Sequence, residues 1–184
     1  EWTGKKILWF GTSIPAGGFI GKTLKSTYPR MVGDKLGAYV VNEAIGSSAV
    51  HCKQPNRVYK DTNPYGFIGN FEACSRCLTN TIAEMQWIID NYNSNIWTSG
   101  TVSSMNDTLK NQILSCSYEN KLNQHLTTTT IPDLIVFDHG HNDLINALDL
   151  EHQYYEQYGE DSLYTFRGAM NFLIKKIKNF NSRI

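Results

Sequence analysis

The stretch that decides the fold reads Lys5-Lys6-Ile7-Leu8-Trp9-Phe10-Gly11-Thr12-Ser13-Ile14-Pro15. Its apolar run from Ile7 to Phe10 is typical of a short strand that is buried on both faces of a parallel sheet. Gly11 ends this run, and Ser13 follows two residues later. Because open α/β sheets bind ligands just beyond the carboxyl ends of their strands, Ser13 is in position to act as a nucleophile. The alternative is a turn serine that caps the next helix.

Two later stretches repeat the pattern of a short apolar strand followed by small or polar residues. Residues 39–48, YVVNEAIGSS, predict a second strand that runs into a turn at Gly46. Residues 134–143, LIVFDHGHND, predict a third strand that ends in Gly-His-Asn-Asp. Buried strands alternating with helices predict an α/β fold with a parallel sheet.

Four helices are predicted from apolar residues at three- and four-residue spacing and from capping residues. The first begins after Thr27 and ends at Gly37, and it joins the first two strands in a right-handed β-α-β unit. The others are predicted over residues 79–92 with Thr79 as cap, over 105–126, and over about 161–180 with Asp161 or Ser162 as cap.

A long insertion, residues 51–130, is expected between the second and third strands. It contains two of these helices, preceded over residues 51–72 by a stretch rich in Pro, Asn, Gly and Tyr that predicts an irregular loop. Four aromatic side chains of this loop either line a sugar-binding cleft or pack into the core. They are Tyr59, Tyr65, Phe67 and Phe71.

The amino-acid composition excludes several classes of protein. The 184 residues are enough for a single domain over 1–184 with a proper core. Lysine plus arginine and aspartate plus glutamate both number 17, so there is no basic excess that would indicate nucleic acid as a partner. No apolar segment approaches the roughly 18 residues that span a bilayer. The absence of a glycine-rich phosphate loop argues against a flavodoxin-like cofactor binder, and no cofactor is expected.

The four cysteines, Cys52, Cys74, Cys77 and Cys116, allow three disulfide pairings that the sequence does not separate. Cys74 and Cys77 have the spacing of a zinc or redox pair, but no second close pair accompanies them. We therefore expect a disulfide or buried free thiols, and no metal site. The compartment stays undecided, with an extracellular setting slightly favoured.

A strand-end serine, a strand-end glycine and a strand-end Gly-His-Asn-Asp, in that order, resemble the first three sequence blocks of the SGNH/GDSL hydrolases. The form Gly140-His141-Asn142-Asp143 is most similar to the carbohydrate esterases of that superfamily, such as rhamnogalacturonan acetylesterases. The resemblance runs from about residue 5 to about residue 180. It implies a three-layer, flavodoxin-like α/β/α fold with a five-stranded parallel sheet, of which three strands are recognisable here.

The resemblance also implies the roles of individual residues. Ser13 would be the nucleophile, and the oxyanion hole would consist of the backbone N–H groups of Ser13 and Gly46 and the side-chain amide of Asn142. His141 would contact the substrate, which would be an acylated carbohydrate or another small ester. These residue types suit the chemistry, since glycine allows close approach and a neutral amide donates without titrating.

The sequence departs from the family pattern at two places. Thr12 stands where the family has an aspartate that takes no part in proton transfer. More seriously, the family has its Asp-x-x-His block, which supplies the catalytic base and its acid, after a further strand near the C-terminus, and no such strand is recognisable after residue 143. The spacing itself occurs once there, at Asp149-Leu150-Glu151-His152, close behind the third strand and before the last predicted helix. We therefore expect this chain to be the N-terminal part of a longer domain, with the missing strands and the Asp-x-x-His on a second polypeptide, a severed piece or absent sequence. His141 is the alternative base, and Asp143 is expected to bond backbone N–H groups.

Two functions from different classes follow. The first is a serine esterase that deacylates a carbohydrate. The second is a carbohydrate-binding or structural module that keeps the hydrolase fold without catalysis, which the missing histidine block favours. Loss of turnover in a Ser13→Ala variant would support the first function, and sugar binding that survives this substitution would support the second.

Overall fold

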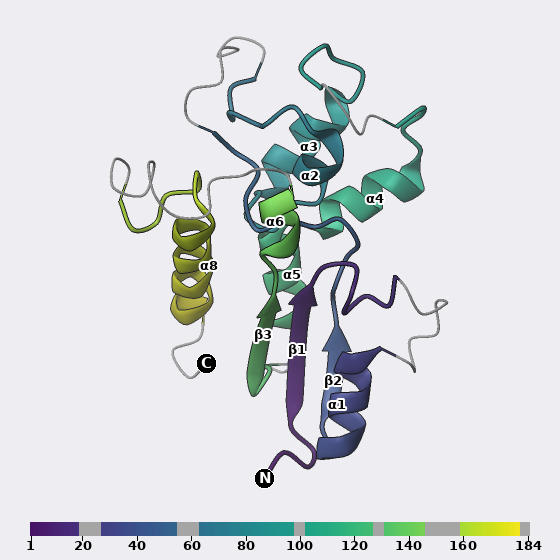
Figure 1. The fold of residues 1–184 in the computed structure, drawn as a ribbon, viewed down its shortest axis with the longest axis vertical. Coiled ribbons are helices and arrows are strands. Elements are labelled where there is room, and N and C mark those ends of the chain that lie inside the picture. The colour runs from purple at the N-terminus through teal and green to yellow at the C-terminus, as the bar shows by residue number, and fades with distance from the viewer. Residues whose placement is uncertain (19–26, 55–62, 98–101, 127–130, 146–158, 181–184) are drawn as a thin grey trace.

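Figure 1 shows the chain as a computed structural model, which describes residues 1–18, 27–54, 63–97, 102–126, 131–145 and 159–180. At its centre, three parallel strands form a sheet in the order β2-β1-β3. The strands are β1 (Lys6–Gly11), β2 (Tyr39–Asn42) and β3 (Leu134–Asp138). The predicted α/β fold with three parallel strands is confirmed. Within the described ranges, no helix is long and apolar enough to cross a membrane.

Strand β1 is the middle strand, as its unbroken apolar run predicts. Ile7 pairs with Val40 on one side and with Leu134 on the other, and Phe10 pairs with Phe137. Both faces of the central strand are therefore covered, and both of its edges are hydrogen-bonded. Since all three strands run in the same direction, their carboxyl ends meet at one edge of the sheet, where ligands bind in such folds.

Helices fill the insertion between β2 and β3, as expected for residues 51–130. They are α2 (Phe71–Ser75), α3 (Ile82–Asp90), α4 (Asp107–Ser115) and α5 (Tyr118–His125). The first three surround a hydrophobic core of their own, in which Phe67, Met85 and Ile113 are buried. In Figure 1 helices α2, α3 and α4 lie beyond the carboxyl ends of the strands. The insertion therefore lies next to the carboxyl edge of the sheet, where a ligand site is expected.

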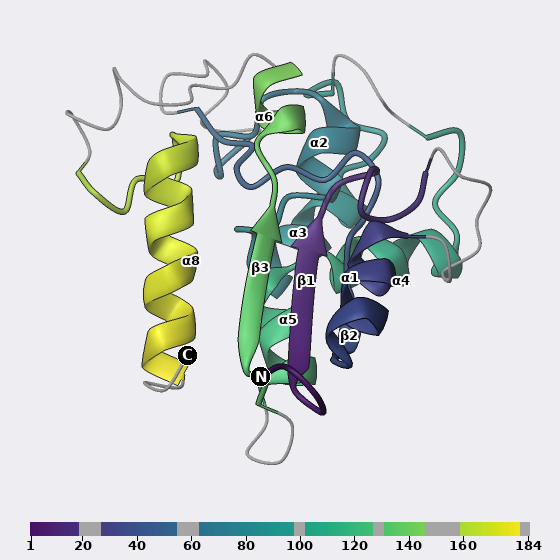
Figure 2. The same ribbon diagram turned by 60° about the horizontal axis from the view of Figure 1, so that its bottom comes forward.

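The two faces of the sheet are covered by different helices, which gives three layers (Figures 1 and 2). On one face, Phe10 packs in a hydrophobic cluster with side chains of α5 and of α8 (Phe166–Phe180). On the other face lies α1 (Tyr28–Leu36), where the rings of Trp9 and Tyr28 meet edge to face with their centroids 5.4 Å apart. The predicted β-α-β unit is thus formed by β1, α1 and β2.

Helices α3 and α8 begin later than predicted. Thr81, and not Thr79, forms the capping box of α3, because the Thr79 side chain is buried and donates to a backbone carbonyl. Helix α8 begins after Thr165, whose hydroxyl accepts a hydrogen bond from a first-turn N–H, and not after Asp161 or Ser162. In both cases a later residue satisfies the free N–H groups of the helix start.

The single helix predicted over residues 105–126 is two helices, α4 and α5. The chain turns at Ser117, whose hydroxyl accepts from the Glu119 N–H as a cap and donates to Asn80 O at 2.7 Å. This second bond comes from a distant residue, so the apolar spacing did not reveal the break. The short helices α2 and α6 (His141–Ile145) were not predicted either.

The aromatic residues of the loop that the structure describes pack in the core, and these three do not line a sugar cleft. Phe67 and Phe71 are fully buried, and Tyr65 packs against Phe67 and Trp87 with ring centroids 5.7 and 5.6 Å away. Tyr59 lies outside the described residues. Of the two alternatives, packing is confirmed for the three residues that the structure describes.

Candidate active site

Ser13 and Gly46 lie beside each other at the carboxyl ends of β1 and β2. A Cβ atom placed on Gly46 would be 3.9 Å from the Ser13 Cβ, and both residues are half-buried. Within the described residues, the Ser13 and Gly46 N–H groups donate no hydrogen bond and the Ser13 hydroxyl has no partner. Ser13 therefore does not cap a helix, and two unpaired backbone donors flank its hydroxyl.

Backbone hydrogen bonds fold the turn that carries Ser13. The Ala16 N–H donates to Thr12 O at 3.2 Å, and the Gly18 N–H donates to Ser13 O at 2.8 Å. A Cβ atom at Gly18 would come within 3.1 Å of Ser13 O, so a side chain there would crowd this turn. Thr12, at the position of the family's aspartate, is buried behind the turn.

Ser48 connects the ends of all three strands. Its hydroxyl donates to Gly11 O at 3.0 Å, at the end of β1. Its carbonyl accepts from the Asn142 side-chain amide at 2.7 Å, beyond the end of β3. Asn142, half-buried in α6, is thereby fixed to the loop that contains Gly46. The three predicted blocks thus meet, although Ser48 itself was not predicted.

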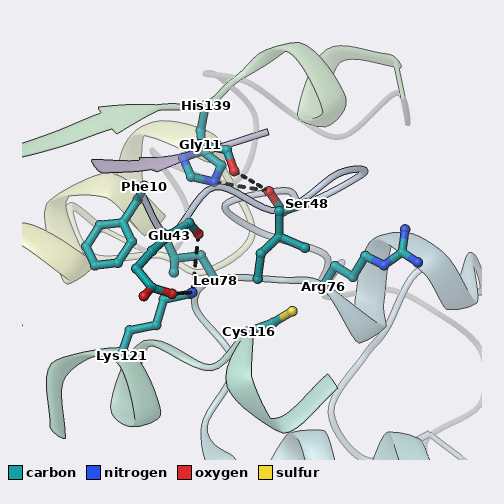
Figure 3. A pocket seen from close by; sticks show the side chains of 10 residues that line it. Phe10, Gly11, Glu43, Ser48, Arg76, Leu78, Cys116, Lys121 and His139 are labelled. Atoms are coloured by element: carbon teal, nitrogen blue, oxygen red, sulfur yellow. Dashed lines mark hydrogen bonds and ion pairs between the residues drawn. The ribbon is translucent and has the colours of Figure 1, made fainter. Parts of the chain in front are cut away.

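The contact between Ser48 and His139 is not a nucleophile–base pair. His139 Nε2 lies 3.3 Å from Ser48 Oγ (Figure 3). Since the Ser48 hydroxyl proton is donated to Gly11 O, the imidazole donates to Ser48 from Nε2. His139 Nδ1 is then a buried acceptor, and it has no partner among the described atoms. Burial lowers the pKa of His139 from 6.5 to about 4, so this ring is neutral near pH 7.

Asp143 fixes the loop after β2, as predicted. Its buried carboxylate accepts hydrogen bonds from the N–H groups of Val50 and His51, both at 3.1 Å. It also lies 2.9 Å from His51 Nδ1. This His51–Asp143 pair has the chemistry of a base and its orienting acid, but neither side chain has any exposed surface. The pair is therefore structural as placed, and no substrate reaches it.

A partly buried ion-pair network borders the same small cavity as Ser48. Lys121 Nζ is 3.2 Å and His125 Nε2 is 2.9 Å from the carboxylate of Glu43, which follows β2. The His125 hydrogen bond and the charge of Lys121 lower the pKa of Glu43 to about 2. Between this network and Ser48 is a cavity of about 10 Å³, which is room for about one water molecule. It is too small to hold a sugar.

Two larger hollows open at the carboxyl edge of the sheet. The first, of about 360 Å³, is lined by Gly46, Arg76 and residues of α4. The second, of about 700 Å³, lies between α6 and α8 and is lined by His141, Leu144 and other residues. The exposed His141 therefore faces the second hollow, while Gly46 borders the first.

The four cysteines are buried and unpaired. Of the two expectations, disulfide or free thiols, the structure has free thiols. Burial raises the pKa of the Cys52 and Cys77 thiols well above their ordinary range, which makes them poor nucleophiles and poor ligands at neutral pH. In the described part of the chain, no three His, Cys, Asp or Glu side chains are grouped in a way that could hold a metal ion.

Comparison with known proteins adds little to this geometry. No protein-family model matches the sequence, and no curated protein matches it. One solved crystal structure is similar over 98% of this chain, with 16% sequence identity and a TM-score of 0.48. The chain spans about half of that protein's length, 53%. A likeness at this level carries no argument about family or activity.

Proposed function

We propose that this chain is the part of an SGNH/GDSL-type serine esterase that carries the nucleophile and the oxyanion hole, and that it deacylates a carbohydrate or another small ester. The observation that supports it best is the placement of Ser13 beside Gly46, with both N–H groups unpaired among the described residues. Asn142 is tied to the same loop by its bond to Ser48 O.

In the proposed ester hydrolysis, each of these residues has one role. Ser13 Oγ attacks the ester carbonyl, whose oxygen becomes negatively charged in the tetrahedral intermediate. The N–H groups of Ser13 and Gly46 and the Asn142 amide donate to this oxyanion. Each such donor is typically worth about 3 kcal/mol of transition-state stabilisation, or a hundredfold or more in rate. The alcohol of the sugar leaves, and water then hydrolyses the acyl-serine.

We propose that the base comes from outside this chain, on an Asp-x-x-His of a second polypeptide or of further sequence. Within the described residues no histidine is hydrogen-bonded to Ser13. His51 is buried against Asp143, and the half-buried His139 contacts Ser48. Asp149 and His152 lie outside the described residues. Strand β3 is at one edge of the described sheet, and each of its residues is partly exposed. Such an edge offers unpaired backbone groups to a further strand. The exposed His141 is the alternative base.

Labelling with a fluorophosphonate, which reacts with activated serines, tests this proposal. The native material, with any associated polypeptide, would be analysed by intact mass and peptide mapping. We expect an adduct on Ser13, and none in a Ser13→Ala variant, while the exposed Ser104→Ala variant labels normally. An adduct on the 20.9 kDa chain alone would mean that a histidine of this chain serves as the base, with His141 the first candidate. Absence of any adduct would refute the esterase.

A non-catalytic carbohydrate-binding module is the second candidate. The observation that favours it is the lack of a base at Ser13 among the described residues. In that case the native material binds sugar, the Ser13→Ala variant binds it equally well, and neither reacts with the fluorophosphonate. Sugar binding together with labelling of Ser13 would exclude this second candidate.

A further inference from the structure

The loop after β2 contains a β-turn over residues 45–48. The Ser48 N–H donates to Ile45 O at 3.2 Å and closes the turn, so that Gly46 and Ser47 are its two central residues. The φ of Gly46 is not positive, whereas the φ of Ser47 is +61°. These signs are those of a type II turn, in which the second central residue has a positive φ and is usually glycine.

Ser47 is held in a conformation that serine rarely adopts. In the described part of the chain it is the only residue other than glycine with a positive φ. A type I turn would accept a serine at this position without strain, and it differs from the type II turn mainly by a half-turn of the central peptide unit. The conformation of Ser47 therefore indicates an interaction that is made only in the type II turn.

Both ends of the turn are attached to one acceptor at the end of β1. The Ile45 N–H donates to Gly11 O at 2.9 Å, and the Ser48 hydroxyl donates to the same oxygen at 3.0 Å. Because these two bonds fix the first and last residues of the turn, the Gly46–Ser47 peptide unit is the part that can rotate without moving the strand ends.

Arg76 holds this central peptide unit from one side. Its Nη1 donates to Gly46 O at 3.3 Å, and it makes no ion pair in the described part of the chain. The backbone of Arg76 is itself fixed, since its carbonyl accepts the Ala49 N–H at 3.4 Å. In a type I turn the Gly46 carbonyl would point away from the guanidinium, and the Ser47 N–H would face this cation instead. The bond from Arg76 is therefore made only in the type II turn.

The turn also directs the Gly46 N–H. Ile45 O accepts from Ser48 inside the turn, so the Gly46 N–H, at the other end of the same planar peptide unit, points out of the turn. A Cβ atom placed on Gly46 would be 3.9 Å from the Ser13 Cβ. A carbonyl oxygen directed at this place would repel the oxyanion that the proposed esterase has to stabilise.

We propose that Arg76 is a positioning residue, which binds Gly46 O and thereby keeps the Gly46–Ser47 peptide unit in the type II orientation, with the Gly46 carbonyl out of the oxyanion hole at Ser13. The orientation of the turn is independent of any activity, whereas its effect on catalysis rests on the proposed esterase. Because Ser47 is strained, the turn returns to type I once the bond from Arg76 is lost. Ser47→Gly removes this dependence, since glycine adopts a positive φ without strain.

The orientation of the turn is measured by NMR on the full chain, labelled with ¹⁵N and ¹³C. The nuclear Overhauser effect between the Gly46 Hα protons and the Ser47 N–H is strong in a type II turn and weak in a type I turn, because the half-turn of the peptide unit separates these protons. We expect a strong signal in the unaltered chain, a weak signal in Arg76→Gln, and a strong signal again in Arg76→Gln combined with Ser47→Gly. Arg76→Lys can still donate to Gly46 O and should keep the strong signal. The matched variant Arg30→Gln, which breaks a surface ion pair, should keep it too.

The rate at which a fluorophosphonate labels Ser13 in the native material measures the effect on the proposed esterase. Arg76→Gln should slow this labelling by about a hundredfold, which is comparable with the loss of one oxyanion donor. Adding Ser47→Gly should restore most of the rate. A contribution of Arg76 to stability alone would not be rescued in this way, because Ser47→Gly does not replace the lost hydrogen bond.

Four results would overturn the inference. They are a weak turn signal in the unaltered chain, a strong signal that persists in the folded Arg76→Gln variant, an unchanged labelling rate in that variant, and a rate that stays low in the double variant although its turn signal is strong. Absence of Ser13 labelling in the unaltered native material, with the turn signals as expected, would instead refute the esterase and with it the catalytic part of the inference. Arg76 would then hold the turn without a role in catalysis.

Discussion

The side-chain amide of Asn142 donates to Ser48 O at 2.7 Å, and this bond ties the end of β3 to the loop after β2. The same serine bonds the end of β1 through its hydroxyl. Ser48 lies two residues after Gly46, and its two bonds join the loop after β2 to Asn142 and to Gly11, two residues before Ser13. Because the bonds of Ser48 are internal, it holds the proposed oxyanion hole in place without touching a substrate.

Ser48→Ala should destabilise the fold, and Ser13→Ala should not. The substitution at Ser48 leaves His139 Nε2 without its partner and removes one of the two donors of Gly11 O, which keeps the Ile45 N–H at 2.9 Å. Loss of a buried partner typically costs about 1–3 kcal/mol. The Ser13 hydroxyl has no partner in the described residues, so its loss should change the free energy of unfolding by less than about 0.5 kcal/mol. Urea denaturation of both variants measures this contrast. Equal stabilities would mean that Ser48 does not hold the strand ends together.

Asp143→Ala should be among the most destabilising single substitutions. It removes a buried carboxylate that accepts from the Val50 and His51 N–H groups and from the His51 ring, and loss of one partner of a buried pair costs about 3–5 kcal/mol. The exposed Asp107→Ala, which breaks only a surface pair with Lys110, should cost less than about 1 kcal/mol. Thermal or urea unfolding distinguishes the two, and similar costs would contradict a structural role for Asp143.

The features of this fold that depend on neighbouring residues could be predicted from the sequence, and those that depend on contacts between distant residues could not. The three strands and the helix between Thr27 and Gly37 were predicted because apolar runs and caps are local signals. The break at Ser117 was missed because the apolar spacing of α4 and α5 continues across it, while the bond from Ser117 to Asn80 O is a tertiary contact.

The candidate site also combines residues predicted from local signals with residues placed by tertiary contacts. Ser13, Gly46 and Asn142 were predicted because each lies within four residues after a strand, where parallel sheets collect ligands. Ser48 and Arg76 were missed. Two adjacent serines after a glycine carry no special signal, and Arg76 reaches Gly46 from 30 positions away in a helical insertion. Only the packing of α2 against the loop after β2 brings that arginine to Gly46.

His139 should make the protein less stable as the pH falls below neutral. Burial lowers its pKa from 6.5 to about 4, so the unfolded chain takes up the proton first. The stability it contributes is complete above pH 6.5 and is lost as the pH falls from 6.5 to about 4. A His139→Gln variant should show a flatter dependence of unfolding free energy over this interval, measured by urea denaturation at several pH values. The same slope in the variant would rule out His139 as its cause.

Glu43 should act over a more acidic interval. Its pKa is lowered from 4.5 to about 2, chiefly by the hydrogen bond from His125 and also by Lys121. The stabilising contribution is therefore present above pH 4.5 and is lost as the pH falls towards 2. Glu43→Gln should flatten the stability profile in this interval and leave the interval from pH 6.5 to 4.5 nearly unchanged. The opposite pattern would indicate that another carboxylate dominates acid unfolding.

Asn142→Ala should lower turnover by about a hundredfold or more in the native, complete esterase, because one oxyanion donor is worth about 3 kcal/mol. It should also cost about 1–3 kcal/mol of stability, since Ser48 O loses its donor. Asn91→Ala is the matched control, because Asn91 also donates from its side chain to a backbone carbonyl, Trp87 O at 2.9 Å, but lies in the insertion. Hydrolysis of a chromogenic acetate ester, measured where both variants are folded, separates the two effects. Equal turnover in both variants would place Asn142 in the scaffold alone and would leave the Ser13 and Gly46 N–H groups as the whole oxyanion hole.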